Sequence, residues 1–160
     1  MLQLRSTSPE ATRNIAAALA GCSRAGDVIV LAGEMGAGKT AFAQGFGVAL
    51  GVVDPITSPT FNLVHSHPAG RLTVHHADLY RLATNHEVAD LALAELAEAD
   101  GVVLVEWGDV VASSLGEHLM VHLRADADDE LARDVQVSAV GRTWAVRWQK
   151  IERDLAGFAC

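Results

Sequence analysis

The stretch VIVLAGEMGAGKTAF, residues 28–42, runs from a series of apolar residues into a glycine-rich turn that ends in a lysine and a threonine. Gly33, Gly38, Lys39 and Thr40 occupy every fixed position of the pattern G-x-x-x-x-G-K-[ST]. A turn of this composition exposes backbone N–H groups, which bind anions. The stretch therefore raises the question of which anion it holds.

The segments that flank the turn have the context that this pattern requires. Residues 27–32 form an apolar run that predicts a strand buried on both faces, and residues 39–50 predict a helix that ends at Gly51. The helix presents its positive end to the turn. Lys39 is expected to reach the β and γ phosphates of a nucleotide, and Thr40 to place its hydroxyl on Mg²⁺. The stretch predicts a nucleoside triphosphate site, because a chance glycine-rich turn would not match both the pattern and its flanks.

The composition describes a globular chain with an acidic surface. It has 160 residues, of which 50% are hydrophobic and 20% charged, and we expect one domain over residues 1–160. No secretory signal and no run of about 20 apolar residues is present, so we expect a cytoplasmic protein. Cys22 and Cys160 form neither a disulfide framework nor a zinc pattern. A net charge of −8 disfavours direct contact with nucleic acid, which would be reached through a partner.

The order of the remaining segments predicts an α/β fold, with a largely parallel, P-loop-type sheet flanked by helices. A capping box of Thr7 and Glu10 predicts a first helix that extends to about Leu19. Two further strands are predicted on either side of a helical segment, and an antiparallel hairpin surrounds the acidic turn DADDE and extends the sheet. The two strands are residues 71–80 and 101–107, and the helical segment between them is residues 85–100. The hairpin strands are residues 117–125 and 132–141.

Two carboxylates follow predicted strands and are candidate site residues. Parallel strands share one rim at their carboxyl ends, where the glycine-rich turn also lies. Glu106 ends the run VVLVE and could bind Mg²⁺ opposite Thr40, and a solvent-exposed acid is the alternative. Asp78 follows TVHHA and could orient the attacking water, and a helix cap is the alternative.

Thr60 is a further candidate, in a polar turn with Ser58 and Pro59. A hydroxyl in the corresponding region of P-loop proteins often senses the γ phosphate by joining the metal shell. An ordinary proline turn explains the same residues equally well.

Four motifs together resemble the TsaE family, also called YjeE. They are GEMGAGKT (33–40), SPTF (58–61), HHADLYRL (75–82) and LVEW (104–107). This family is the bacterial ATPase used in the threonylcarbamoyl modification of adenosine in tRNA. The resemblance covers roughly residues 8–125, and the tail from about residue 142 matches nothing recognisable.

The resemblance implies roles for individual residues. It implies Mg²⁺ at Thr40 and Glu106, catalytic roles for Asp78 and Glu106, a switch-like role for Thr60, and Trp107 beside the site. It implies ATP or ADP as cofactor, bound by Glu34, Met35, Gly36, Ala37, Gly38, Lys39, Thr40, Ala41 and Trp107. The family often has a second Thr or Ser where this chain has Ala41, so a hydroxyl contact to the α phosphate is missing here.

The resemblance also implies partners, namely proteins like TsaD and TsaB that carry tRNA and transfer the threonylcarbamoyl group. No arginine of this chain is an obvious finger for the transition state, so we expect a slow ATPase that depends on them. Two alternatives stay open. A small-molecule kinase would need an acceptor pocket and an arginine-rich lid, whereas the 12 basic residues are scattered. A nucleotide-gated binding module would need little turnover.

Overall fold

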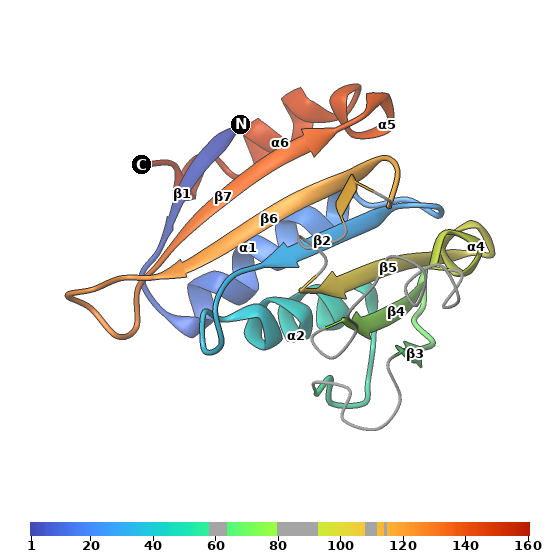
Figure 1. Cartoon of the computed structure of the whole chain (residues 1–160), viewed down its shortest axis with the longest axis horizontal. Coiled ribbons are helices and arrows are strands. Elements are labelled where there is room, and N and C mark those ends of the chain that lie inside the picture. Colours follow the sequence, from blue (N-terminus) through green and yellow to red (C-terminus); the bar gives the residue numbers. More distant parts are fainter. Residues whose placement is uncertain (58–63, 80–92, 108–111, 114) are drawn as a thin grey trace.

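The computed structural model describes residues 1–57, 64–79, 93–107, 112–113 and 115–160. Its centre is a seven-stranded sheet with the order β1-β7-β6-β2-β5-β4-β3 (Figure 1). The strands are β1 (Leu2–Ser6), β2 (Val28–Ala32), β3 (Val64–His67), β4 (Thr73–Asp78), β5 (Gly101–Glu106), β6 (His118–Ala125) and β7 (Arg133–Val140). The described helices are α1 (Pro9–Cys22), α2 (Lys39–Leu50), α4 (Leu93–Glu98), α5 (Arg142–Ala145) and α6 (Trp148–Asp154), followed by the 3₁₀ turn η2 (Ala156–Phe158).

The predicted fold class is confirmed. The four central strands β6, β2, β5 and β4 run parallel to one another. The predicted C-terminal hairpin is formed by β6 and β7, which pair antiparallel from His118 and Val140 to Ala125 and Arg133. The sequence did not predict β1, which extends the hairpin antiparallel to β7, and β3 lies antiparallel at the other edge.

The central strands are apolar throughout because both faces of the sheet are covered. Every residue of β2 and of β5 is buried. Alternate residues of β2 belong to different cores: Leu31 packs with the cluster that includes α1 and α2, and Val30 packs with the cluster on the α4 side. Figure 1 shows α1 and α2 side by side behind the sheet. The carboxyl ends of the parallel strands therefore lie together at one end of the strands, beside the start of α2.

Helices α1 and α2 pack closely because a glycine faces the contact. A Cβ added at Gly45 of α2 would lie 2.5 Å from the Cα of Arg13 in α1. The predicted capping box of α1 is wrong by one residue: Ser8 is the N-cap, and its Oγ accepts a hydrogen bond from the N–H of Ala11 (3.0 Å). Pro9 occupies the first helical position, which fits a residue without an N–H group.

The C-terminal tail packs onto the core through aromatic side chains. Trp144 is fully buried, and Arg147 makes a two-pronged contact with Asp27, just before β2. The guanidinium also lies 4.1 Å from the centre of the Trp144 ring. In the described part of the chain, no helix is both long and apolar enough to span a membrane.

Candidate functional site

The glycine-rich turn connects β2 to α2 as predicted, and its glycines are required by the backbone. Gly33 has φ +140° and Gly38 has φ +105°, values that residues with a side chain rarely adopt. Gly38 is the N-cap of α2, so the positive end of the helix opens onto the turn. A Cβ at Gly33 would lie 2.3 Å from the carbonyl oxygen of Leu123. The loop is therefore pressed against β6.

Lys39 folds back over this loop. Its side chain is buried, and Nζ donates hydrogen bonds to the carbonyl oxygens of Gly33 and Glu34, both at 2.7 Å. Nζ also lies 4.1 Å from the centre of the Trp107 ring, a cation–π distance. These contacts hold the ammonium group at the loop and place Trp107, the residue after β5, next to it. The predicted proximity of Trp107 to the glycine-rich loop is thereby observed.

Glu106 and Asp78 lie side by side at the ends of neighbouring strands. They are register partners in the parallel pair of β4 and β5, and Glu106 is in turn opposite Leu31 of β2. Glu106 is only 2% exposed, so the alternative of a solvent-exposed strand-end acid is excluded for it, and Asp78 is half-buried. The two acidic residues therefore lie next to each other at the rim, as expected from the sequence.

His76 is a site residue that the sequence did not single out. It is fully buried on β4, and its Nε2 lies 2.7 Å from Oε2 of Glu106. Its position two residues before Asp78 puts both side chains on one face of the strand, and this alternation was the available signal. Among the described residues, Nδ1 of His76 and Nε2 of His67 are buried without a hydrogen-bond partner.

The other predicted site residues have different exposures. Glu34, Met35 and Gly36 are exposed at the tip of the loop, whereas Ala37 is buried beneath it. Thr40 and Ala41 are half-buried in the first turn of α2. Thr60, with Ser58 and Pro59, lies outside the described residues.

The oxygen donors at the rim suit Mg²⁺. Among the residues whose positions are described, no three His, Cys, Asp or Glu side chains converge as a metal site. Mg²⁺ does not require such a cluster, since it is commonly held by one or two protein oxygens, the phosphates of a nucleotide and water. The Thr40 hydroxyl and the Glu106 carboxylate are hard oxygen ligands of this kind. The residues present therefore fit the ion.

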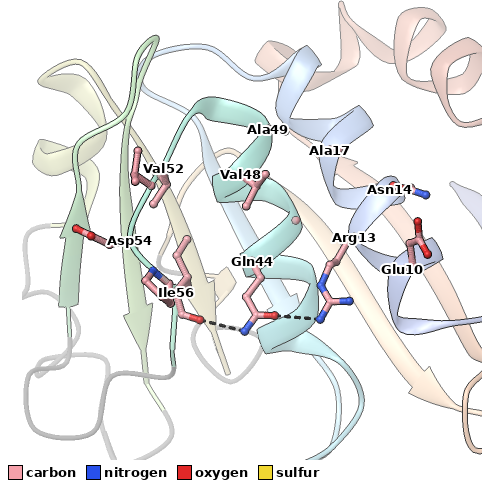
Figure 2. Close-up of a pocket in the computed structure, with 13 residues that line it drawn as sticks. Glu10, Arg13, Asn14, Ala17, Gln44, Val48, Ala49, Val52, Asp54 and Ile56 are labelled. Atoms are coloured by element: carbon pink, nitrogen blue, oxygen red, sulfur yellow. Dashed lines mark hydrogen bonds between the residues drawn. The ribbon is translucent and has the colours of Figure 1, made fainter.

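A separate cavity lies on the outer side of α1 and α2 (Figure 2). Its volume is about 510 Å³, and it is bounded by both helices and by residues 52–56. Arg13 donates to the side-chain oxygen of Gln44 (3.3 Å), and the Gln44 amide donates to the carbonyl oxygen of Ile56 (3.2 Å). No residue of the glycine-rich loop lines this cavity.

Comparison with known proteins relates the chain to one family. The model of the family described as threonylcarbamoyl adenosine biosynthesis protein TsaE matches residues 6–135. The tRNA threonylcarbamoyladenosine biosynthesis protein TsaE of Bacillus subtilis (strain 168) is 36% identical over 153 residues, which is 95% of this chain and 94% of that protein. The protein of the same name from Streptomyces coelicolor is 40% identical over 142 residues, which is 83% of this chain and 93% of that protein.

A solved structure shows the same fold. The crystal structure of Bacillus subtilis YdiB has a TM-score of 0.76 to this chain at 32% sequence identity, and the match covers 95% of this chain and 94% of that one. The match to this structure includes part of the C-terminal tail, whereas the family model ends at residue 135. From the family match and the full-length relatives it follows that the chain belongs to the TsaE family.

Proposed function

We propose that this chain is a Mg²⁺-dependent ATPase that serves the threonylcarbamoyl modification of adenosine in tRNA. The relatives named for tRNA threonylcarbamoyladenosine biosynthesis support the pathway. The observation that carries the nucleotide site is the arrangement of Lys39, whose ammonium group lies over the glycine-rich loop and against Trp107. This contact supports a site that includes both the loop and Glu106, the residue before Trp107.

Each residue of the site has a role in this proposal. The loop from Gly36 to Lys39 binds the phosphates, with the Lys39 charge at the β and γ positions. Thr40 and Glu106 hold Mg²⁺, which supplies neutralisation of the phosphate charge. Asp78, beside Glu106, orients the attacking water. Thr60 senses the γ phosphate.

Partner proteins complete the cycle. The net charge of −8 disfavours direct binding of tRNA, so proteins like TsaD and TsaB would carry tRNA and transfer the threonylcarbamoyl group. Phosphoryl transfer gains orders of magnitude when a partner supplies or orders a missing charged group. The isolated chain is therefore a slow ATPase in the cytoplasm, stimulated by these partners.

ATP titration of Lys39→Ala tests the nucleotide site. Loss of two charge-assisted hydrogen bonds to phosphate, at about 1.5 kcal/mol each or more, should weaken binding about 100-fold or more. Lys150→Ala is the matched control, because it removes the same charge from a lysine that pairs with Asp154 on α6. Unchanged ATP affinity in the Lys39 variant would refute the site.

Phosphate release measured with and without the partners tests turnover. Asp78→Ala should slow hydrolysis while ATP affinity stays close to that of the wild type, whereas Glu106→Ala should weaken the Mg²⁺-dependent part of binding as well. The isolated protein should be slow and should accelerate when the partners are added. A rate of about 1 to 100 per second alone, typical of kinases, with no gain on addition of partners, would contradict the proposal.

A further inference from the structure

Arg133, the first residue of β7, reaches across to the glycine-rich loop. Its Nε donates a hydrogen bond to the carbonyl oxygen of Ala37 (3.0 Å) and its Nη2 to that of Gly36 (3.3 Å). Nη1 donates to the carbonyl oxygens of Glu130 and Ala132, at 2.7 and 2.6 Å. All four acceptors are backbone carbonyls, so the guanidinium group joins the loop directly to the hairpin.

The hairpin that carries Arg133 is fixed by its own contacts. Oδ1 of Asp126 accepts hydrogen bonds from the N–H groups of Asp128 and Asp129, at 2.8 and 3.1 Å, which defines the turn. The guanidinium of Arg5, on β1, lies 2.5 Å from Oδ2 of Asp126. The β6 strand of the same hairpin is in parallel register with β2. Arg133 therefore extends from a hairpin that is bonded to β1 and paired with β2.

The contact with the two carbonyls determines how the loop peptides are oriented. The C=O and N–H of a trans peptide unit point in opposite directions. Since the carbonyls of Gly36 and Ala37 point toward Arg133, the N–H groups of Ala37 and Gly38 point away from it. The N–H of Ala37 closes a turn onto the carbonyl oxygen of Glu34. In loops of this pattern, the backbone N–H groups are the ligands of the phosphates. Arg133 therefore holds these two peptide units by their carbonyls, on the side opposite to their N–H groups.

We propose that Arg133 is a positioning residue that holds the glycine-rich loop in its phosphate-binding conformation before a nucleotide arrives. This inference rests on the proposed function and adds a residue from β7 to the nucleotide site. The planar fork of the guanidinium spans two successive carbonyls, which a single ammonium group cannot do. Arg133 acts through the loop, so ATP and ADP, which share the α and β phosphates, should depend on it equally.

The test compares Arg133→Ala and Arg133→Lys with Arg124→Ala. Arg124 is the matched control, because it lies in the same hairpin, is well exposed and is 3.8 Å from Asp134. For Arg133→Ala we expect the Kd of both ATP and ADP to rise about tenfold, which corresponds to about 1.4 kcal/mol. In steady-state hydrolysis, KM should rise while kcat stays within a factor of about two, as expected for a loss of uniform binding.

Hydrogen exchange without nucleotide gives a readout that does not depend on activity. The N–H of Ala37 donates to the carbonyl oxygen of Glu34 at 3.0 Å, and its exchange should become faster in Arg133→Ala but not in Arg124→Ala. Arg133→Lys keeps the charge and the packed stem but not the fork, so it should resemble Arg133→Ala. The lysine variant also keeps the test possible if the alanine variant does not fold.

Several results would overturn the inference. Unchanged Kd values in Arg133→Ala would do so, as would a fall in kcat at constant Kd, which would assign Arg133 to the transition state. Full recovery of affinity in Arg133→Lys would attribute the effect to charge instead of to the fork. If the wild-type chain binds neither ATP nor ADP, the proposed function fails, and unchanged exchange at Ala37 in Arg133→Ala would then overturn the positioning role separately.

Discussion

Replacement of His76 by alanine should strongly destabilise the protein, because the imidazole supports a buried carboxylate. His76 is fully buried, and its Nε2 lies 2.7 Å from Oε2 of Glu106, which is itself 2% exposed. A hydrogen bond to a charged group contributes about 1.5–3 kcal/mol. Removal of the ring also leaves a cavity, which costs about 2 kcal/mol or more at a packed position. We expect the free energy of unfolding to fall by about 4 kcal/mol.

Urea unfolding at neutral pH measures this loss, and His76→Gln is the matched variant. The glutamine amide can donate to Glu106 in place of Nε2–H, so about half of the stability should return. A second readout concerns the site: if His76 orients Glu106 toward Mg²⁺, His76→Ala should raise the Mg²⁺ concentration needed for tight ATP binding, and His76→Gln should do so less. A loss below about 1 kcal/mol with an unchanged Mg²⁺ requirement would refute the reasoning.

Two further predictions concern the stability of the fold. Arg147→Ala should lower the free energy of unfolding by about 3–5 kcal/mol in urea, because Asp27, bonded to Arg147 at 2.6 and 2.7 Å, would stay buried without its cationic partner and keep only the N–H of Arg24. ATP affinity should not change, since Asp27 precedes β2 and the loop follows it; a parallel loss of affinity would contradict this. Burial lowers the pKa of His75 below 6.5, so its neutral form is favoured in the folded state. Stability should therefore decrease as the pH falls below 6.5, because the unfolded chain takes up the proton more readily than the folded one. In thermal unfolding, His75→Gln should reduce the dependence of stability on pH between about pH 7.5 and pH 5.5. An equal pH dependence in the variant would contradict the role given to His75.

The sequence predicted those parts of the fold that depend on local pattern. The strand at residues 28–32 is buried on both faces, so its apolar run is unambiguous, and the helix after it has a glycine at each end. Glu106 was also predictable, because a polar residue that ends such a run must lie at the rim of a parallel sheet. In these cases, one short segment contains all the information.

The sequence did not predict features that depend on contacts between distant segments. The β1 strand pairs with β7, which is more than 120 residues away, and nothing within residues 2–6 indicates that partner. His76 could be placed on the face of Asp78 by alternation, but its bond to Glu106 depends on the register of β4 and β5. The cap of α1 was assigned to Thr7 instead of Ser8 because a capping-box pattern does not account for Pro9 at the first helical position.

The sequence identified Lys39 as a site residue but not Arg133, and this difference has a physical basis. The glycine-rich pattern specifies the side of the loop that faces phosphate, since the anion requires N–H groups and a cation at fixed spacing. The opposite side of the loop must satisfy carbonyl oxygens, and any donor that the surrounding fold brings there can do so. In this chain that donor comes from β7, 96 residues from Ala37. A motif can therefore identify the residues that would contact a ligand, whereas the residues that hold those ligand contacts in place become visible only when the strand order is known.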